Sequence, residues 1–362
     1  MTRVAVIGAG SIGLAIAWRA AHAGAAVVVH DPAPGSGASR VAAGMIAPAT
    51  ETHYGEQALA PLMAASADAW PAFAADLEQA TGLDVGFCDV PTLVVGLDDA
   101  DRAEVEHQAD LYRATDRTVD TLTPRAARQT EPLLSHRVRG GLLAPGDRAV
   151  DPRVVHKALI IAAEHAGVQF HTAPVTDTTA LDADQTVIAG GCGSAALEPW
   201  RLSVRPVRGV VLRLRAEGQA VPRTTVRGFV KGHPIYIVTR SDGEIVIGAT
   251  SDERGFDTRT ATAGAVHDLL RHAIELVPEI AEYHLDEVSV GFRPATPDNL
   301  PLLGRLDART IAATGHYRNG IALIPATATA VAALIAGEDP DALRPFDPHR
   351  FTPGRTVKES HQ

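Results

Sequence analysis

The sequence predicts an α/β fold in which a Rossmann-like nucleotide domain, carrying a GxGxxG loop, receives an inserted α+β domain built on an antiparallel sheet. Three observations predict it. The first is a strand-loop-helix-strand unit at the start of the chain, with apolar strands at 3–7 and 26–30 around GAGSIG. The second is a hairpin pattern, PIYIVTR-SDG-EIVIGAT, within alternating strands over 205–250. The third is the length of 362 residues, which suits two domains.

The remaining elements follow from hydrophobic periodicity and from their end signals. The stretch DPRVVHKALIIAAEHAG gives the clearest helix, because a proline stands near its start and a glycine closes it. In chain order we expect a helix at 56–80, a strand at 92–97, a helix at 98–116, a strand before Pro145, a helix at 151–167, strands at 168–175 and 185–191, a helix at 262–277, a strand at 310–314 and a helix at 325–336. We assign 1–85, 144–204 and 291–362 to the nucleotide domain, and 86–143 and 205–290 to the inserted substrate domain.

Composition and charge narrow the class of protein. The formal net charge of −10 argues against binding of nucleic acid or of an anionic membrane, since both need a basic face. The two cysteines, Cys88 and Cys192, indicate neither a disulfide framework nor a metal site, and they suit a reducing compartment. No apolar run reaches the roughly 18–20 residues of a spanning helix, and no signal peptide is visible. We therefore expect a cytoplasmic protein without membrane, nucleic-acid or metal partners.

The glycine loop predicts a dinucleotide site. Gly8 allows the tight turn, Gly10 lets the backbone approach a pyrophosphate, and Gly13 lets the helix pack closely on the strand. The helix that follows offers free N–H groups and the positive end of its dipole to the anion. Asp31 ends the second strand 18 positions after Gly13, where an acid binds the ribose hydroxyls and disfavours the 2′-phosphate of NADP. The fingerprint alone leaves NAD and FAD open.

Three downstream segments carry a family resemblance. They are SRVAAGM at 39–45, GFRP at 291–294 followed by PDN at 297–299, and GHYRNGI at 315–321. With these motifs the chain resembles the D-amino-acid-oxidase/glycine-oxidase family of flavoproteins over nearly its whole length. The resemblance implies that the nucleotide domain is an FAD-binding Rossmann-like domain and that the flavin is held without a covalent bond.

The resemblance also implies contacts to the cofactor beyond the glycine loop. The GHYRNGI loop precedes a predicted helix, so free N–H groups can face a reduced, anionic flavin. Together with the glycines and Asp31, the cofactor residues it implies are Ser11, Ile12, Ser39, Ala43, Gly44, Met45, Val175, Gly191, His316, Tyr317, Arg318, Asn319, Gly320 and Ile321.

The substrate site that the resemblance implies is built to hold a carboxylate. The planar fork of arginine binds a carboxylate through two hydrogen bonds, and Arg293 and Arg318 both lie in family motifs. Tyr236 matches the hydroxyl donor of the family, since a tyrosine on a half-buried strand can point a polar tip inward. No dedicated protein base is expected, because the flavin carries the chemistry once the amine is neutral.

The expected reaction is the oxidative deamination of glycine, or another small amine, to the imine and glyoxylate, with ammonia and hydrogen peroxide as products. Within the family the resemblance is to members that supply thiazole synthesis for thiamine, which implies a functional link to a thiazole synthase. An oxidase or dehydrogenase of sarcosine, D-alanine, D-proline or another small amino acid remains open. A nicotinamide-dependent dehydrogenase and a non-catalytic flavin-binding protein are more distant alternatives. Oxygen is the expected electron acceptor, while another acceptor and a homo-oligomeric state are left open.

Overall fold

The nucleotide motif at the start of the chain forms the centre of a six-stranded sheet. The computed structural model describes residues 1–351 and gives the strand order β15-β16-β9-β1-β2-β8. β1 (Arg3–Ile7) pairs in parallel with β2 (Ala26–His30) on one side and with β9 (Gln185–Ile188) on the other. The outer strands are β8 (Gln169–His171), β16 (Thr310–Thr314) and the antiparallel β15 (Leu302–Arg305). Three distant segments of the chain therefore build one sheet.

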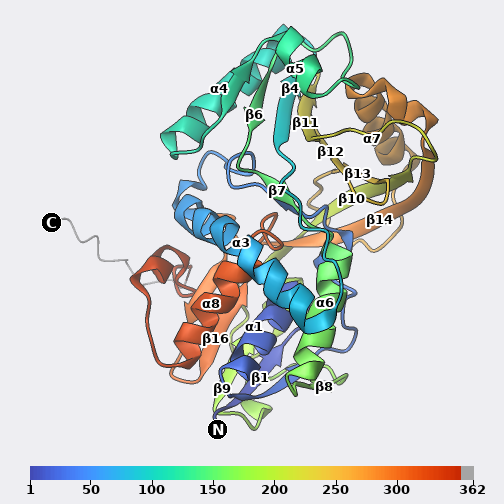
Figure 1. Ribbon diagram of the computed structural model, residues 1–362. Coiled ribbons are helices and arrows are strands. Elements are labelled where there is room, and N and C mark those ends of the chain that lie inside the picture. The colour runs from blue at the N-terminus through green and yellow to red at the C-terminus, as the bar shows by residue number, and fades with distance from the viewer. Residues whose placement is uncertain (352–362) are drawn as a thin grey trace, which may run out of the picture.

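Four helices pack beside this sheet (Figure 1). They are α1 (Ser11–His22), α3 (Ala60–Thr81), α6 (Pro152–His165) and α8 (Ile324–Ile335). α1 contacts both α6 and α8, and α3 lies across α6 and α8. α6 begins as its sequence predicts, because the Asp151 side chain accepts hydrogen bonds from the N–H groups of Arg153 and Val154. The apolar faces of these helices and of the sheet form the larger core of the molecule.

The second large sheet has eight strands and forms the upper half of the molecule in Figure 1. Its order is β14 (His284–Ala295), β10 (Arg205–Arg215), β13 (Glu244–Gly248), β12 (His233–Thr239), β11 (Thr225–Val230), β4 (Thr92–Gly96), β6 (Gly141–Ala144) and β5 (Asp120–Leu122). Every pair is antiparallel except β4 with β11. The helices α4 (Asp99–Ala114), α5 (Pro124–Thr130) and α7 (Ala263–Leu276) belong to this half. The predicted fold class, including the hairpin, is confirmed.

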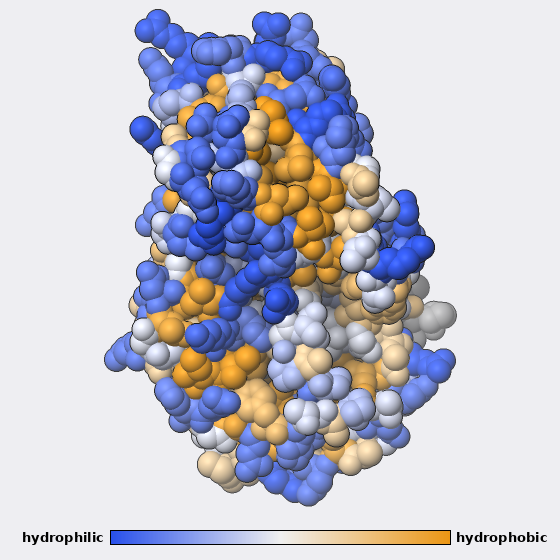
Figure 2. Space-filling model, turned by 90° about the vertical axis from the view of Figure 1, so that its right-hand side faces the viewer, coloured by the Kyte–Doolittle hydropathy of each residue, from blue (hydrophilic) through white to orange (hydrophobic). Residues whose placement is uncertain are grey.

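Short elements connect the two halves. α2 (Ala38–Val41) is followed by β3 (Met45–Ile46), which pairs with β7 (Arg148–Ala149). Short 3-10 turns complete the chain at Gln57–Leu59, Thr178–Ala180, Gly191–Ala196, Pro278–Glu282 and Asp341–Phe346. On the face drawn in Figure 2, a long apolar stretch lies in the upper half, smaller apolar patches lie in the lower half, and much of the remaining surface is hydrophilic.

The structure differs from the sequence prediction in several element bounds. The strand expected over 168–175 ends at His171, so Val175 lies in a loop; Pro174 has no N–H to continue a ladder. The strand expected over 185–191 ends at Ile188, and a 3-10 turn begins at Gly191. β14 runs across residue 290, where we placed a domain boundary. The division into two domains stays a prediction, and its last stretch, 352–362, lies outside the described residues.

Candidate active site

A cavity of about 610 Å³ opens between the glycine loop and the eight-stranded sheet. Tyr236 and Arg293, two of the predicted substrate residues, line it. The predicted cofactor residues that line it are Gly8, Gly10, Ser11, Ile12, Asp31, Ser39, Ala43, Gly44, Met45, Val175, Gly191, His316, Tyr317, Arg318, Gly320 and Ile321. Gly13 and Asn319 are not among the lining residues. The fold thus brings nearly all of the sequence-predicted residues to one place.

The three glycines of the loop have distinct steric surroundings. Gly8 has φ +110°, and a Cβ there would lie 2.5 Å from the carbonyl oxygen of Ala189. A Cβ on Gly13 would lie 2.0 Å from the carbonyl oxygen of Gly8, so only glycine lets α1 approach β1 this closely. Gly10 differs, because its nearest neighbour is the hydroxyl oxygen of Ser39 at 3.7 Å. The loop therefore leaves open space at the one glycine that the sequence assigns to the pyrophosphate.

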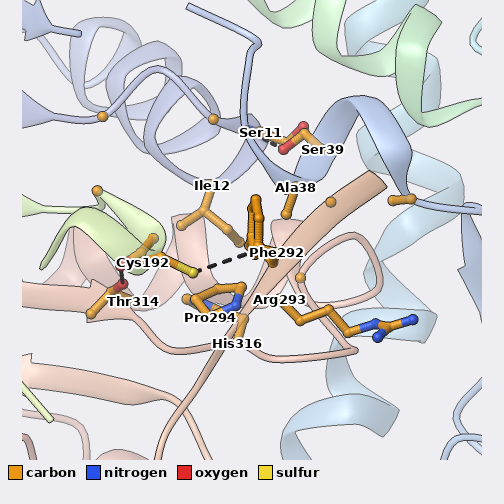
Figure 3. A pocket seen from close by; sticks show the side chains of 18 of the residues that line it. Ser11, Ile12, Ala38, Ser39, Cys192, Phe292, Arg293, Pro294, Thr314 and His316 are labelled. Carbon is orange, nitrogen blue, oxygen red and sulfur yellow. Dashed lines mark hydrogen bonds between the residues drawn. The ribbon is translucent and has the colours of Figure 1, made fainter. Parts of the chain in front are cut away.

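Polar groups surround that space. α1 begins at Ser11 without a side-chain cap, and the N–H of Ser11 donates a hydrogen bond to the hydroxyl of Ser39 at 3.1 Å (Figure 3). The Ser11 hydroxyl is buried and has no hydrogen-bond partner within residues 1–351. An uncapped helix N-terminus beside an unsatisfied hydroxyl is the donor set that a phosphate needs. The residues present fit the pyrophosphate of a dinucleotide.

Asp31 connects the end of β2 to the glycine loop. One carboxylate oxygen accepts a hydrogen bond from the N–H of Ala9 at 2.7 Å, and the other accepts from the N–H of Ala33 at 2.8 Å. Asp31 lines the cavity as well. It therefore fixes the loop conformation, and its predicted contact to the ribose would use the lone pairs that remain.

The small-residue segment is held by a buried arginine that the sequence did not single out. Arg240, at the end of the predicted hairpin strand, donates hydrogen bonds to the carbonyl oxygens of Ala43 and Val150. Gly44 has φ +83°, and a Cβ there would lie 2.1 Å from the Val150 oxygen. Burial lowers the pKa of Arg240. The segment thus owes its close approach to the cavity to contacts from the other half of the molecule.

The loop at 315–321 closes the cavity on the side of α8. His316 is buried, and its Nε2 is 3.0 Å from the hydroxyl of Thr327. Burial lowers the pKa of His316 to about 4, so the ring is neutral near pH 7. Tyr317 has φ +48°, and its N–H donates to the carbonyl oxygen of Pro294 at 2.9 Å. The Asn319 side chain is buried without a hydrogen-bond partner in the described part of the chain.

Arg318 already has a carboxylate partner in the protein. Its Nη2 lies 2.7 Å and 2.9 Å from the two oxygens of Glu56, which is buried. Its guanidinium also lies 4.6 Å from the centre of the Tyr317 ring. Arg318 reaches the cavity as a member of an ion pair, whereas its role toward the substrate stays a prediction.

The register of the eight-stranded sheet sets the other wall. Directly paired residues of neighbouring strands point to the same face, and Arg227 of β11 pairs with Tyr236 of β12, which pairs with Gly248 of β13. Val211 of β10 pairs with Gly248 in turn. Since Arg293 of β14 pairs with Val207, four residues from Val211 on the same strand, its side chain lies on this face too.

Two glycines of this face make room for the predicted substrate residues. A Cβ on Gly209 would lie 2.7 Å from an Nη atom of Arg293, and a Cβ on Gly248 would lie 2.1 Å from the hydroxyl of Tyr236. Both polar side chains are therefore laid across the sheet. Nη1 of Arg293 donates to the carbonyl oxygen of Thr250 at 3.1 Å. In Figure 3 the Arg293 side chain extends from β14 away from Cys192 and Thr314.

Sequence reasoning missed a buried ion pair beside these residues. Arg227 donates a hydrogen bond to Oε1 of Glu51, and the two side chains are 17% and 8% exposed. Burial alone would raise the pKa of Glu51, but the charges of Arg227, His53 and Arg318 hold it below its ordinary range. The sequence offered two signals for this pair. Glu51 is a lone acid at the end of a run of small and apolar residues, and Arg227 lies within the apolar strand TVRGFV. Neither signal says that the two side chains meet.

A comparison with protein families identifies the cofactor. The sequence profile described as FAD dependent oxidoreductase matches residues 3–334. The chain belongs to this family. Its match includes both the glycine loop and the loop at 315–321, so the open choice between NAD and FAD is decided, and FAD is the cofactor. The steric and polar features of the glycine loop fit that cofactor.

Relatives within the FAD dependent oxidoreductase family carry related names. The bifunctional protein ThiO/ThiG of Trichormus variabilis is 34% identical over 95% of this chain, and the chain spans only 54% of that relative's length. The glycine oxidase of Geobacillus kaustophilus is 34% identical over 92% of each chain. Its crystal structure superposes with a TM-score of 0.89 and covers 97% of this chain and 99% of its own. The iminodiacetate oxidase of Chelativorans superposes with a TM-score of 0.84 at 26% identity, covering 96% and 99%.

Two other kinds of site find no support within residues 1–351. No helix in this part of the chain is long and apolar enough to cross a membrane. Within the same residues, no group of three or more His, Cys, Asp or Glu side chains is placed to hold a metal ion. Cys88 and Cys192 are both free thiols. Burial raises the pKa of Cys192 to about 12, so this thiol is not ionised near pH 7.

Proposed function

We propose that this chain is an FAD-dependent glycine oxidase, which converts glycine or another very small amino acid to the imine and then to glyoxylate, ammonia and hydrogen peroxide. The observation that carries the proposal is the placement of Arg293. A guanidinium is laid over Gly209 in the cavity that also contains the glycine loop, and the sheet register sets Tyr236 on the same face. The glycine oxidase of Geobacillus kaustophilus supports the choice of substrate.

We propose that Arg293 binds the substrate carboxylate. Its one hydrogen bond to protein within residues 1–351 is the bond from Nη1 to Thr250, so the rest of its donors can serve a ligand. Tyr236 would add a hydroxyl donor to the same carboxylate, since burial raises its pKa and keeps the phenol protonated. Arg318, which lines the same cavity, would add positive charge. The carboxylate would then fix the orientation of the Cα–H bond.

When bound, FAD would supply the oxidising power for the removal of a hydride equivalent from Cα of the neutral amine. The protein contributes orientation and exclusion of water. A general base is not needed for this step, and the Nε2 atom of His316 is 3.0 Å from the hydroxyl of Thr327. Water converts the imine product to the oxo acid and ammonia.

One experiment tests the function directly. Purified protein is mixed without air with a panel of glycine, sarcosine, D-alanine, D-proline and iminodiacetate, and bleaching of the oxidised flavin absorbance is followed. We expect glycine to bleach the flavin at least as efficiently as the others, and peroxide to form when air is admitted. More efficient bleaching by a panel member other than glycine would reassign the substrate, and no bleaching by any of them would contradict the proposal.

A small secondary amine is the second candidate. The iminodiacetate oxidase of Chelativorans has this fold at 26% identity, so the cavity could accept an N-substituted glycine. Sarcosine and iminodiacetate in the same panel distinguish this candidate from glycine.

The wider setting is also a proposal. The bifunctional ThiO/ThiG relative supports a link between this activity and thiazole synthesis for thiamine, with a thiazole synthase as the functional partner. We propose in addition a cytoplasmic location, non-covalent FAD and oxygen as the electron acceptor, with a homo-oligomer as an open assembly state. Release of free FAD on denaturation tests the non-covalent attachment.

A further inference from the structure

Glu51 is a buried carboxylate in the wall of the substrate cavity. It follows the small-residue segment in a turn, where its N–H donates to the carbonyl oxygen of Ala47 at 3.0 Å. Its side chain is 8% exposed and lines the same cavity as Arg293 and Tyr236. Acids are rarely buried to this extent unless they are paired or bind a ligand.

The two oxygens of Glu51 have different surroundings. Oε1 accepts the hydrogen bond from Arg227, whereas Oε2 is buried and has no hydrogen-bond partner in the described part of the chain. The nearest cationic atoms to Oε2 are Nε of Arg318 at 3.7 Å and Nε2 of His53 at 3.9 Å. Both distances exceed a hydrogen bond. A buried carboxylate oxygen without a donor is costly, so Oε2 calls for a donor from a ligand.

Glu51 lies where it can contact the amino group of a bound amino acid. Arg227, which holds Oε1, is the direct cross-strand partner of Tyr236. The proposed donors to the substrate carboxylate and the unsatisfied oxygen of Glu51 therefore border one cavity. A small amino acid carries its amino group one carbon away from its carboxylate, and an ionised carboxylate accepts a charge-assisted hydrogen bond from an N–H of that group, whether the group is an ammonium or a neutral amine.

We propose that Oε2 of Glu51 binds the amino group of the substrate, while Arg293 and Tyr236 bind its carboxylate. This inference rests on the proposed amino-acid oxidase function and deepens it. Glu51 then selects amino acids over plain carboxylic acids of the same size. It also stabilises the positive charge that grows on nitrogen as the C–N bond gains double-bond character. A ligand without an amino group would meet only repulsion from Glu51.

The test compares two ligands that differ only in the amino group. Binding of glycine and of acetate is measured by calorimetry on the FAD-loaded protein, reduced with dithionite and kept without air, so that glycine is not consumed. In the Glu51→Gln variant we expect the Kd of glycine to rise roughly 10- to 100-fold, as for loss of a charge-assisted hydrogen bond. The Kd of acetate should stay the same or fall, because a repelling charge has been removed.

The matched control is Glu56→Gln. Glu56 is a buried acid five residues along the chain that binds Arg318, but it does not line the main cavity. Its loss should change the Kd values of glycine and acetate by similar factors. If Glu51→Gln fails to retain FAD, Glu51→Asp keeps the charge but withdraws it by one methylene, and a weakening confined to glycine is again expected.

The outcomes separate this inference from the proposed function. A wild-type protein that does not bind glycine contradicts the substrate assignment alone. The same measurement is then made with the amino acid that bleaches the flavin and with the acid that lacks its amino group. If wild type binds the amino acid and the Glu51 variants keep the wild-type ratio of the two Kd values, Glu51 is only the structural partner of Arg227 and the inference is overturned. An equal, glycine-specific loss in Glu56→Gln would overturn it as well.

Discussion

The flavin side and the substrate side of the cavity are built in different ways. On the flavin side, Gly8, Gly10 and Gly13 stand within six residues, and Gly13 lies against the carbonyl oxygen of Gly8 in the same loop. On the substrate side, Arg227 and Arg293 come from strands separated by β12, β13 and β10 in the sheet order. The residues of the glycine loop are therefore close together in the sequence, whereas the residues of the substrate side come together only when the strands pair in the correct register.

This difference predicts a separation of effects. Changes on the flavin side should lower flavin content and leave the choice of substrate alone, because the glycine loop does not contribute to the face that carries Arg293. Changes on the substrate side should leave flavin content near normal and alter kcat/KM. Substitutions on both sides test this separation, beginning with the largest expected effect.

The largest effect is expected for Gly13→Val. A Cβ at this position would overlap the Gly8 carbonyl oxygen, which is 2.0 Å away and belongs to rigid backbone. The purified variant should therefore contain roughly a tenth or less of the wild-type flavin, measured from the absorbance ratio of flavin to protein. Gly146→Ala is the control, since a Cβ added there would have no other atom within 4 Å. Full flavin content in Gly13→Val would show that helix and strand can separate without loss of the site.

The next largest effect is expected for Arg293→Ala. Loss of a buried charged contact costs on the order of 2–5 kcal/mol, so kcat/KM for glycine should fall roughly 30- to several-thousand-fold. Arg293→Lys should be impaired too, because an ammonium keeps the charge but not the planar fork. Flavin content should stay near normal in both.

Arg215→Ala is the matched control for Arg293, because Arg215 lies at the other end of the same pair of strands and is 37% exposed. It should keep wild-type kcat/KM. Near wild-type oxidation of glycine by Arg293→Ala would move the carboxylate anchor to Arg318.

The sequence predicts the flavin side in detail because its signals are local. The strands 3–7 and 26–30 are found at their predicted bounds, and the residues of the glycine loop act on one another. Glu51 and Arg227 could not be predicted, because their contact joins residues 176 positions apart and depends on sheet register. The predicted strand over 168–175 was too long for a more limited reason. The alternation of VQFHTAPV favoured a strand up to Val175, although Pro174 has no N–H to donate to a strand pair.

A smaller effect is expected for Asp31→Ala. The variant removes the acceptor for the N–H groups of Ala9 and Ala33 and the predicted acceptor for the ribose. A charge-assisted hydrogen bond contributes about 1.5–3 kcal/mol, so the Kd of FAD should rise roughly 10- to 150-fold in titrations of the apoprotein. Turnover with saturating FAD should fall much less.

Asp31→Asn sharpens this prediction. The amide keeps one oxygen to accept from the Ala9 N–H and loses the negative charge, so an intermediate Kd is expected. An unchanged Kd of FAD in Asp31→Ala would mean that the end of β2 and the glycine loop keep their conformation without this carboxylate.

The smallest of these effects is expected for Tyr236→Phe, which keeps the ring over Gly248 and removes only the hydroxyl. Arg293 still binds the carboxylate, so the loss should be about 1.5 kcal/mol, or roughly tenfold in kcat/KM for glycine, with normal flavin content. Burial raises the pKa of Tyr236, and Arg293 only partly opposes that rise. A group with a raised pKa stays protonated as the pH increases, so the phenol remains a donor and the ratio of wild-type to variant kcat/KM should be constant between about pH 7 and 9. A ratio that falls toward one in this range would show that the phenol ionises there. A tenfold loss that appeared for amines lacking a carboxylate as well would place the hydroxyl against the flavin or the amine, and so against the division of the cavity into two separately built sides.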